Sequence, residues 1–210
     1  MTKLTIEEVC RLAPVVPVMV IDDLDKAVPL ARALVAGGLR ALEITLRTPV
    51  ALDAIRAIAE AVPDAEVGVG TLRMPSDVVA AAAAGATFGV SPGLSLDLLD
   101  AADQAGLPML PGVATPSEAM AASERGSKIL KFFPAEANGG VPVLKAWGSA
   151  LLGLSFCPTG GVSLKNAPEY LSLPNVVCVG GSWVAPKEAV AANDWDAITR
   201  LAKEASALKT

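Results

Sequence analysis

The chain of 210 residues carries 17 lysines and arginines against 22 acidic residues, a formal net charge of −5 at pH 7, and it contains no histidine. This balance, without any basic run, argues against nucleic acids and membranes as partners, and the missing imidazole excludes Ser-His-Asp and Cys-His catalysis and His-ligated metal sites. Three scattered cysteines, the lack of a signal peptide and the lack of an uncharged apolar run of about 18 residues predict a cytoplasmic protein with free, mostly buried thiols.

Short β-branched runs alternate with alanine- and leucine-rich stretches along the chain, after a first helix expected from about Thr5 to Leu12. About eight strands are expected, roughly 23 residues apart, as in successive βα units. They are Val15–Val20, Ala41–Thr45, Glu66–Gly70, Phe88–Ser91, Pro108–Leu110, Ile129–Phe133, Ser155–Cys157 and Val176–Gly180. This pattern predicts an α/β fold, a compact (β/α)8 TIM barrel in which residues 1–210 form a single domain, with an open doubly wound sheet as the alternative.

Helix boundaries carry signals that agree with this reading. Thr48-Pro49 and Thr115-Pro116 predict an N-cap followed by proline in the first turn, and Glu118 would complete a capping box with Thr115. Gly37-Gly38 and Gly106 predict helix C-termini.

Prolines follow the fourth to seventh expected strands. Because proline cannot donate a ladder hydrogen bond, these positions are expected to mark where strand pairing stops. In a barrel, they then lie at the carboxyl rim, where active sites are found. The four prolines are Pro92, Pro111, Pro134 and Pro158.

Lys131 lies within the sixth expected strand. Side chains alternate along a strand, so Lys131 and Phe133 are expected to face the barrel interior, whereas Leu130 and Phe132 face the helices. An ammonium group is costly in this place unless it is paired or neutral, and desolvation favours the neutral amine, which is the nucleophile of Schiff-base chemistry. The alternative is a lysine that reaches solvent from a strand end.

Glu43 is expected to face the interior from the second strand. In a chain without histidine, this carboxyl group is a natural general acid/base for carbinolamine, imine and enamine steps, and a plain buried ion pair is the alternative. Arg47 offers a planar fork for a carboxylate and Thr71 a hydroxyl at the rim. The alternatives for these two are a rim ion pair and a turn or N-cap residue.

Glycine pairs follow the last two expected strands, in Gly160-Gly161 and Gly180-Gly181-Ser182. Barrels often bind phosphate with these two loops, because glycines let backbone N–H groups approach an anion. Gly68-Val69-Gly70 lacks the third glycine of a dinucleotide fingerprint, so no nicotinamide cofactor is expected.

The segments that carry these residues, taken together, resemble the family of 2-keto-3-deoxy-6-phosphogluconate (KDPG) aldolases, over nearly the whole chain. They are Leu42-Glu43-Ile44-Thr45-Leu46-Arg47-Thr48, Gly68-Val69-Gly70-Thr71, Ser91-Pro92-Gly93, Lys131-Phe132-Phe133-Pro134-Ala135-Glu136, Cys157-Pro158-Thr159-Gly160-Gly161 and Gly180-Gly181-Ser182-Trp183.

The resemblance implies a class I aldolase, a lyase of the Entner–Doudoroff pathway of carbohydrate metabolism. Such an enzyme is a homotrimer, uses no metal or cofactor, and reversibly cleaves KDPG to pyruvate and glyceraldehyde 3-phosphate. Lys131 would form the Schiff base and Glu43 would be the acid/base. The substrate-binding residues implied are Arg47 and Thr71 at the pyruvate carboxylate, Phe133 and Pro92 on the pocket wall, and Gly160, Gly161, Gly181 and Ser182 at the phosphate, with Thr159 nearby.

Several functions stay open at this point. The galactonate epimer and 4-hydroxy-2-oxoglutarate are rival substrates, and the Thr159 hydroxyl favours the gluconate compound because a few pocket hydrogen bonds decide between epimers. A phosphate-binding barrel isomerase without covalent chemistry and a non-enzymatic assembly scaffold are the rivals from other classes.

Overall fold

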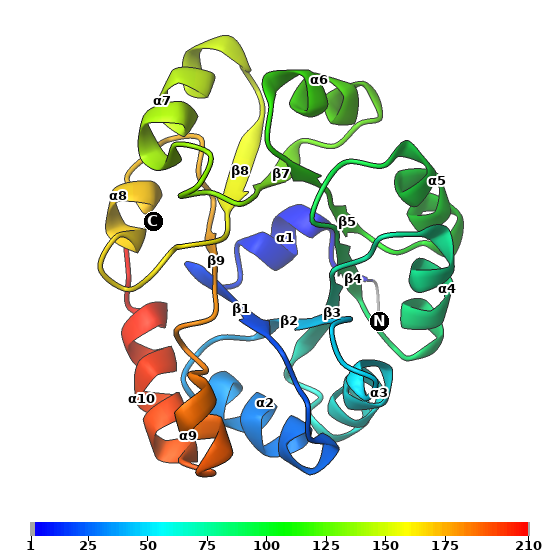
Figure 1. Cartoon of the computed structure of the whole chain (residues 1–210), viewed down its shortest axis with the longest axis vertical. Helices are drawn as coiled ribbons and strands as arrows, with labels where there is room; N and C mark the ends of the chain where they lie inside the picture. Colours follow the sequence, from blue (N-terminus) through cyan, green and yellow to red (C-terminus); the bar gives the residue numbers. More distant parts are fainter. Residues whose placement is uncertain (1–2, 210) are drawn as a thin grey trace.

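The computed structural model describes residues 3–209, and its parallel strands form a ring that helices surround (Figure 1). One sheet has the order β5-β4-β3-β2-β1-β9 and the other the order β6-β7-β8. Isolated bridges from Phe156 to Val176 and from Thr159 to Gly180 join the two sheets beside β8. The ring is therefore closed, and the expected (β/α)8 barrel with an extra N-terminal helix is confirmed.

The strands are β1 (Val15–Met19), β2 (Ala41–Thr45), β3 (Glu66–Gly70), β4 (Phe88–Val90), β5 (Met109–Leu110), β6 (Gly112–Val113), β7 (Ile129–Phe132), β8 (Ser155–Pro158) and β9 (Val179–Gly181). The helices are α1 (Ile6–Cys10), the 3-10 turn η1 (Leu24–Lys26), α2 (Ala27–Ala36), α3 (Ala51–Ala61), α4 (Pro75–Ala83), α5 (Leu96–Ala105), α6 (Pro116–Glu124), α7 (Gly140–Ala150), α8 (Ala167–Leu171), α9 (Lys187–Ala191) and α10 (Trp195–Ser206). Within the described residues, none of these helices has the length and apolar character needed to cross a bilayer.

The fifth barrel strand departs from the prediction. Pairing was expected to stop at Pro111, but the strand changes partner there: β5 pairs with β4, and β6 pairs with β7. Although Pro111 has no N–H to donate, its carbonyl accepts a hydrogen bond from the Lys131 backbone N–H at 2.8 Å. Pro158 likewise lies inside β8, opposite Phe132. A proline limits only the donor side of a ladder, so these two do not end their strands.

Two further boundaries were predicted wrongly. The last strand was expected over Val176–Gly180, but its ladder with β1 covers Val179–Gly181, and Val176 makes only a bridge to Phe156. Thr48 does not cap α3, because its hydroxyl donates to the Ile21 carbonyl at 2.5 Å and the helix begins at Ala51.

The other helix signals are confirmed. Thr115 and Glu118 form the capping box of α6. Gly37 is the C-cap of α2, and Gly106 ends α5 in the left-handed conformation. These signals act within one turn of chain, so tertiary packing did not override them.

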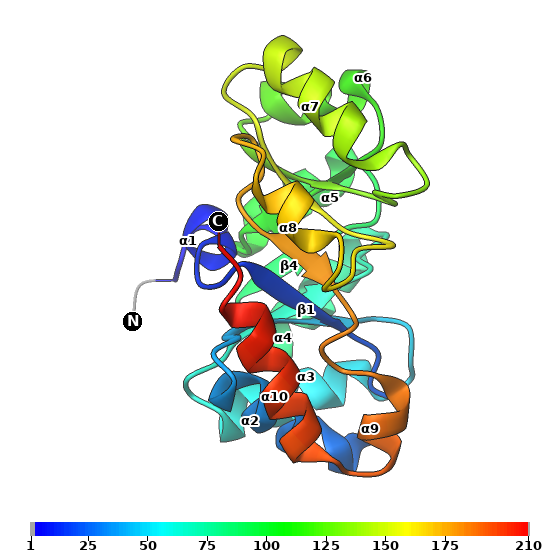
Figure 2. The ribbon, with the colours of Figure 1, turned by 90° about the vertical axis from the view of Figure 1, so that its left-hand side faces the viewer.

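Two apolar layers hold the barrel together. The larger one lies between the strands and the surrounding helices, where Phe132 packs edge-on against Trp147 with ring centroids 5.1 Å apart. The smaller one fills the barrel interior at the amino end of the strands, where α1 contributes Val9 and Cys10. Helix α1 lies at one side of the barrel in Figure 2 and packs on this interior layer, so α1 closes that end.

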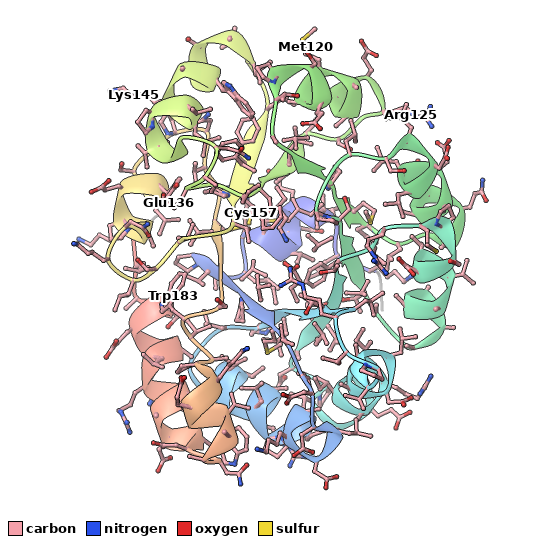
Figure 3. The ribbon with its side chains drawn as sticks, in the orientation of Figure 1. Met120, Arg125, Glu136, Lys145, Cys157 and Trp183 are labelled. Carbon is pink, nitrogen blue, oxygen red and sulfur yellow. The ribbon has the colours of Figure 1, made fainter. Side chains whose placement is uncertain are left out.

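All three cysteines are free and buried, as expected, and they meet in the interior layer. Figure 3 places Cys157 toward the centre of the ring. Hydrogen bonding with the Cys10 thiol, then with the Cys157 thiol, and burial raise the pKa of the Cys178 thiol well above its usual value. Cys178 therefore stays protonated, and it is unsuited to act as a nucleophile.

Candidate active site

Lys131 and Glu43 meet in the middle of the barrel, above this interior layer. Lys131 lies on β7 and Glu43 on β2, and the two side chains are 5% and 3% exposed. The Lys131 Nζ donates to Glu43 Oε1 at 3.1 Å. The alternation predicted for β7 is confirmed, because Ile129 belongs to the interior layer whereas Leu130 and Phe132 belong to the outer one.

Gly70 makes room for this pair. A Cβ atom on Gly70 would lie 2.2 Å from Glu43 Oε1, so any other residue here would displace the carboxylate. The ammonium group lies over the Phe133 ring, with Nζ 5.3 Å from the ring centroid. An amine and a carboxyl group at hydrogen-bond distance, shielded from water, can exchange a proton directly.

Arg47 and Thr71 form a second contact at the carboxyl rim. The Arg47 Nε donates to Thr71 Oγ1 at 3.2 Å. Thr71 has a φ of +64°, which is rare and strained for a β-branched residue. This conformation turns the chain at the end of β3, and no hydrogen bond among the described residues engages the terminal nitrogens of Arg47. The arrangement leaves part of the guanidinium fork and the threonine oxygen available to a carboxylate.

A cavity of about 550 Å³ opens at the same rim. Most of the residues that the sequence indicated line it, namely Arg47, Lys131, Phe133, Thr159, Gly160, Gly161, Gly181 and Ser182. Glu43 and Thr71 do not line the cavity themselves, but Glu43 contacts Lys131 and Thr71 contacts Arg47, which do. Pro92 does not line this cavity; its backbone packs against Gly112 instead.

Sequence reasoning missed other residues of the cavity wall, among them Val18, Val20, Val162, Trp183 and Lys187. The alternation expected along Val15–Val20 puts Val18 and Val20 on one face, so these two valines could have been found. In the sequence, Trp183 was noted only as the last residue of the segment that begins at Gly180, without a role of its own. No local signal in the sequence points to Lys187, because its place depends on how the last loop folds back over the barrel.

The loop after β8 is held from outside the barrel. Gly161 has a φ of +81°, and a Cβ atom there would lie 2.5 Å from Glu136 Cγ. The Glu136 backbone N–H donates to the Gly160 carbonyl at 3.1 Å, and the Tyr170 hydroxyl donates to the Glu136 carboxylate. Figure 3 shows Glu136 near α8, the helix that carries Tyr170. Glu136 and Tyr170 therefore fix the position of the loop without lining the cavity.

We expect Tyr170 to make the protein sensitive to alkali. Burial, and then the hydrogen bond to Glu136, raise the pKa of this phenol well above its usual value. The folded state thus holds the proton more tightly than the unfolded chain, a contribution to stability that is complete below about pH 10 and lost as the pH rises further. The melting temperature should fall more steeply above this pH in the wild type than in Tyr170→Phe.

The chain has only one tyrosine, so the tyrosinate absorbance of the native protein reports Tyr170 alone. Cys178 contributes its own alkaline loss in both proteins, and the difference between them isolates the phenol. A native protein whose tyrosine titrates at the ordinary pKa would contradict this prediction.

Comparison with known proteins agrees along nearly the full chain. The family model for KDPG and KHG aldolase matches residues 6–201. The 2-dehydro-3-deoxy-phosphogluconate aldolase of Pseudoalteromonas atlantica is 54% identical over 205 residues, which cover 98% of this chain and 95% of that protein.

Two solved structures show the same agreement in three dimensions. The KDPG aldolase of Legionella pneumophila, crystallised with pyruvate captured at low pH as a covalent carbinolamine intermediate, is 46% identical with a TM-score of 0.95, and the match covers 98% of this chain and 100% of that one. The aldolase of Zymomonas mobilis ZM4, crystallised with 3-phosphoglycerate, is 50% identical with a TM-score of 0.92, and the match covers 97% of this chain and 95% of that one.

Proposed function

The chain belongs to the KDPG and KHG aldolase family and is a lyase, a 2-dehydro-3-deoxy-phosphogluconate aldolase, and we propose that Lys131 is its Schiff-base residue and Glu43 its general acid/base. The observation that carries the proposal is the buried contact of 3.1 Å between Lys131 Nζ and Glu43 Oε1 beside the cavity. The predicted family and lyase class are confirmed, and the isomerase and scaffold alternatives fall away.

The contact between these two groups suits each step of imine catalysis. Glu43 takes a proton from the Lys131 ammonium group, and the neutral amine attacks the keto carbon of the substrate. Glu43 returns this proton to the carbinolamine hydroxyl, which leaves as water and gives an iminium ion. Glu43 takes the proton of the C4 hydroxyl, the C3–C4 bond breaks, and its electron pair passes into the iminium to give an enamine. Glyceraldehyde 3-phosphate leaves, Glu43 returns a proton to C3, and water releases pyruvate from Lys131.

Arg47 and Thr71 are proposed to hold the carboxylate of the keto acid. The Arg47 fork can donate two parallel hydrogen bonds to a carboxylate, and its bond to Thr71 orients it. The Thr71 backbone already occupies a strained conformation in the free protein, so little ordering remains to be done on binding. Phe133 would form the wall that keeps water from the Lys131 amine.

The phosphate end of the substrate is proposed to lie across the cavity, at the loops after β8 and β9. Gly160, Gly161 and Gly181 expose backbone to the cavity, and Ser182 adds a hydroxyl donor. Such glycine-rich loops bind anions through their N–H groups. This arrangement stretches the substrate between Arg47 at one end and Ser182 at the other, with its keto group at Lys131.

Thr159 is proposed to discriminate between epimers. It is 6% exposed and lines the cavity, where its hydroxyl can meet a substrate hydroxyl. We expect kcat/KM for KDPG to exceed that for the galactonate epimer and for 4-hydroxy-2-oxoglutarate by at least about 10-fold, and Thr159→Val to remove most of the preference between the epimers. Steady-state assays with each substrate measure this, with Thr87→Val as the control outside the cavity. Higher kcat/KM for the galactonate epimer would contradict it.

We also propose that the chain acts as a homotrimer in the cytoplasm. The family resemblance supports the trimer, and three free thiols support a reducing compartment. Sedimentation equilibrium should give three times the mass of one chain, and a monomer at assay concentration would end the trimer proposal. Recovery of the activity with periplasmic contents after osmotic shock would end the cytoplasmic one.

A further inference from the structure

The cavity needs local positive charge to hold a phosphorylated keto acid. The whole chain carries a net charge of −5, so its long-range field does not attract an anion. Three cationic side chains line the cavity, Arg47, Lys131 and Lys187. Arg47 is bonded to Thr71 and Lys131 to Glu43. No hydrogen bond or ion pair within residues 3–209 engages the Lys187 side chain, which leaves its ammonium group free for a ligand.

The position of Lys187 matches the proposed phosphate end. It is the first residue of α9 and follows the loop that begins at Ser182, directly after Gly181 at the end of β9. Its side chain is exposed and lines the same cavity as Gly160 and Gly161. Figure 2 shows α9 on the side of the barrel away from α1, which is the side of the carboxyl rim.

A neighbouring cavity offers Lys187 another partner. This cavity, of about 450 Å³, is lined by Lys187 together with Asp22, Asp23 and Lys26. Asp23 already accepts a hydrogen bond from the Asp25 N–H and lies 3.9 Å from Lys26 Nζ. Asp22 lines this cavity with Lys187 but forms no ion pair with it, so Asp22 is the acidic group that a substrate anion would compete with for the Lys187 ammonium.

We propose that Lys187 binds the phosphate dianion of the substrate and thereby selects phosphorylated keto acids, an inference that rests on the proposed function above. The glycine loops and Ser182 supply neutral donors in a fixed geometry, whereas Lys187 supplies the charge. An ammonium group on a flexible stem suits this role at an exposed rim, because it can follow the phosphate in and release it with the aldehyde product. Since the group is exposed, its contribution is moderate and depends on ionic strength.

The test compares Lys187→Gln with wild type on KDPG and on its unphosphorylated analogue, at low and high salt. KM for KDPG should rise by about 3- to 5-fold at low salt with little change in kcat, since one exposed charge is removed from substrate binding. KM for the analogue should change by less than about 2-fold, and the salt dependence of KM for KDPG should weaken. Lys187→Arg should restore most of the affinity.

Lys165→Gln is the matched control, because Lys165 is also exposed in the preceding loop but does not line the cavity. Equal effects of Lys187→Gln on both substrates, or an unchanged KM for KDPG, would overturn the inference. So would an Asp22→Asn variant with the same KM change as Lys187→Gln, since the lysine would then act through Asp22. Failure of the proposed function looks different: the wild type would cleave neither substrate and would form no borohydride-trapped adduct with pyruvate.

Discussion

Replacing Lys131 with methionine is expected to lower kcat for KDPG cleavage by about 10⁴- to 10⁶-fold, the range seen when a covalent nucleophile is removed. Methionine matches the length of the lysine stem but has no amine to form the imine. Without the iminium, the electrons of the breaking C3–C4 bond have no acceptor. Loss of this group therefore removes the covalent step itself, and the remaining binding groups cannot replace it.

The direct readout is the mass of the protein after addition of pyruvate and sodium borohydride. Wild type should gain one reduced pyruvate adduct, and peptide mapping should locate it on Lys131, whereas Lys131→Met should gain none. Lys128→Met is the matched control, because Lys128 is exposed just before β7. This variant undergoes the same borohydride treatment and should still gain the adduct. An adduct that mapped to another lysine, or turnover kept by Lys131→Met, would end the assignment.

The substitution of Lys131 also lowers the free energy of unfolding. Lys131 is the hydrogen-bond partner of a buried carboxyl group, and removal of one member of a buried pair costs about 3–5 kcal/mol unless the other becomes neutral. A thermal melt of Lys131→Met must accompany the assay. If this variant unfolds, adduct mapping on the wild type still decides the question, because it needs no substitution.

Replacing Glu43 with glutamine is expected to lower kcat by about 10²- to 10⁴-fold, the usual contribution of a general acid/base. Glutamine keeps the size of the side chain and can still accept a hydrogen bond from Lys131, but it cannot carry a proton. The imine with pyruvate should therefore still form, more slowly, whereas proton transfer at C3 should nearly stop. The two variants thus separate the nucleophile from the acid/base.

Proton transfer can be followed without the aldol substrate. In deuterium oxide, wild type should exchange the methyl protons of pyruvate through the enamine, and Glu43→Gln should lose this exchange by the same factor as kcat. Glu66→Gln on the neighbouring strand β3 is the control, because Glu66 lies at the opposite, amino end of the barrel. Exchange at the wild-type rate in Glu43→Gln would show that another group moves the proton.

The exchange and trapping experiments also test the geometry of the pair. Gly70 leaves no space for a larger residue beside Glu43 Oε1, so Gly70→Ala should displace the carboxylate while both catalytic side chains remain present. A loss of exchange in that variant would come from position alone, which supports the role of Glu43 independently of its own substitution.

Features that depend on near neighbours in the chain could be predicted from the amino-acid sequence. The repeat of βα units predicted the barrel, and alternation along the strands placed Lys131 and Glu43 in its interior. The capping box at Thr115 and the C-cap at Gly106 were also readable, because their hydrogen bonds span one helical turn. The directions of successive side chains along a strand or helix are set by backbone geometry, so this pattern can be followed in the sequence.

Contacts between groups that are distant in the sequence could not be predicted in this way. Lys131 and Glu43 lie 88 positions apart in the chain, and their distance depends on the closure of the whole ring. The same holds for the partner change at Pro111, for the room that Gly70 leaves, and for the entry of Lys187 into the cavity. In each case the residue contacts a segment that is far away in the sequence. These contacts form only when the strands close into a barrel, so no local pattern in the sequence can reveal them.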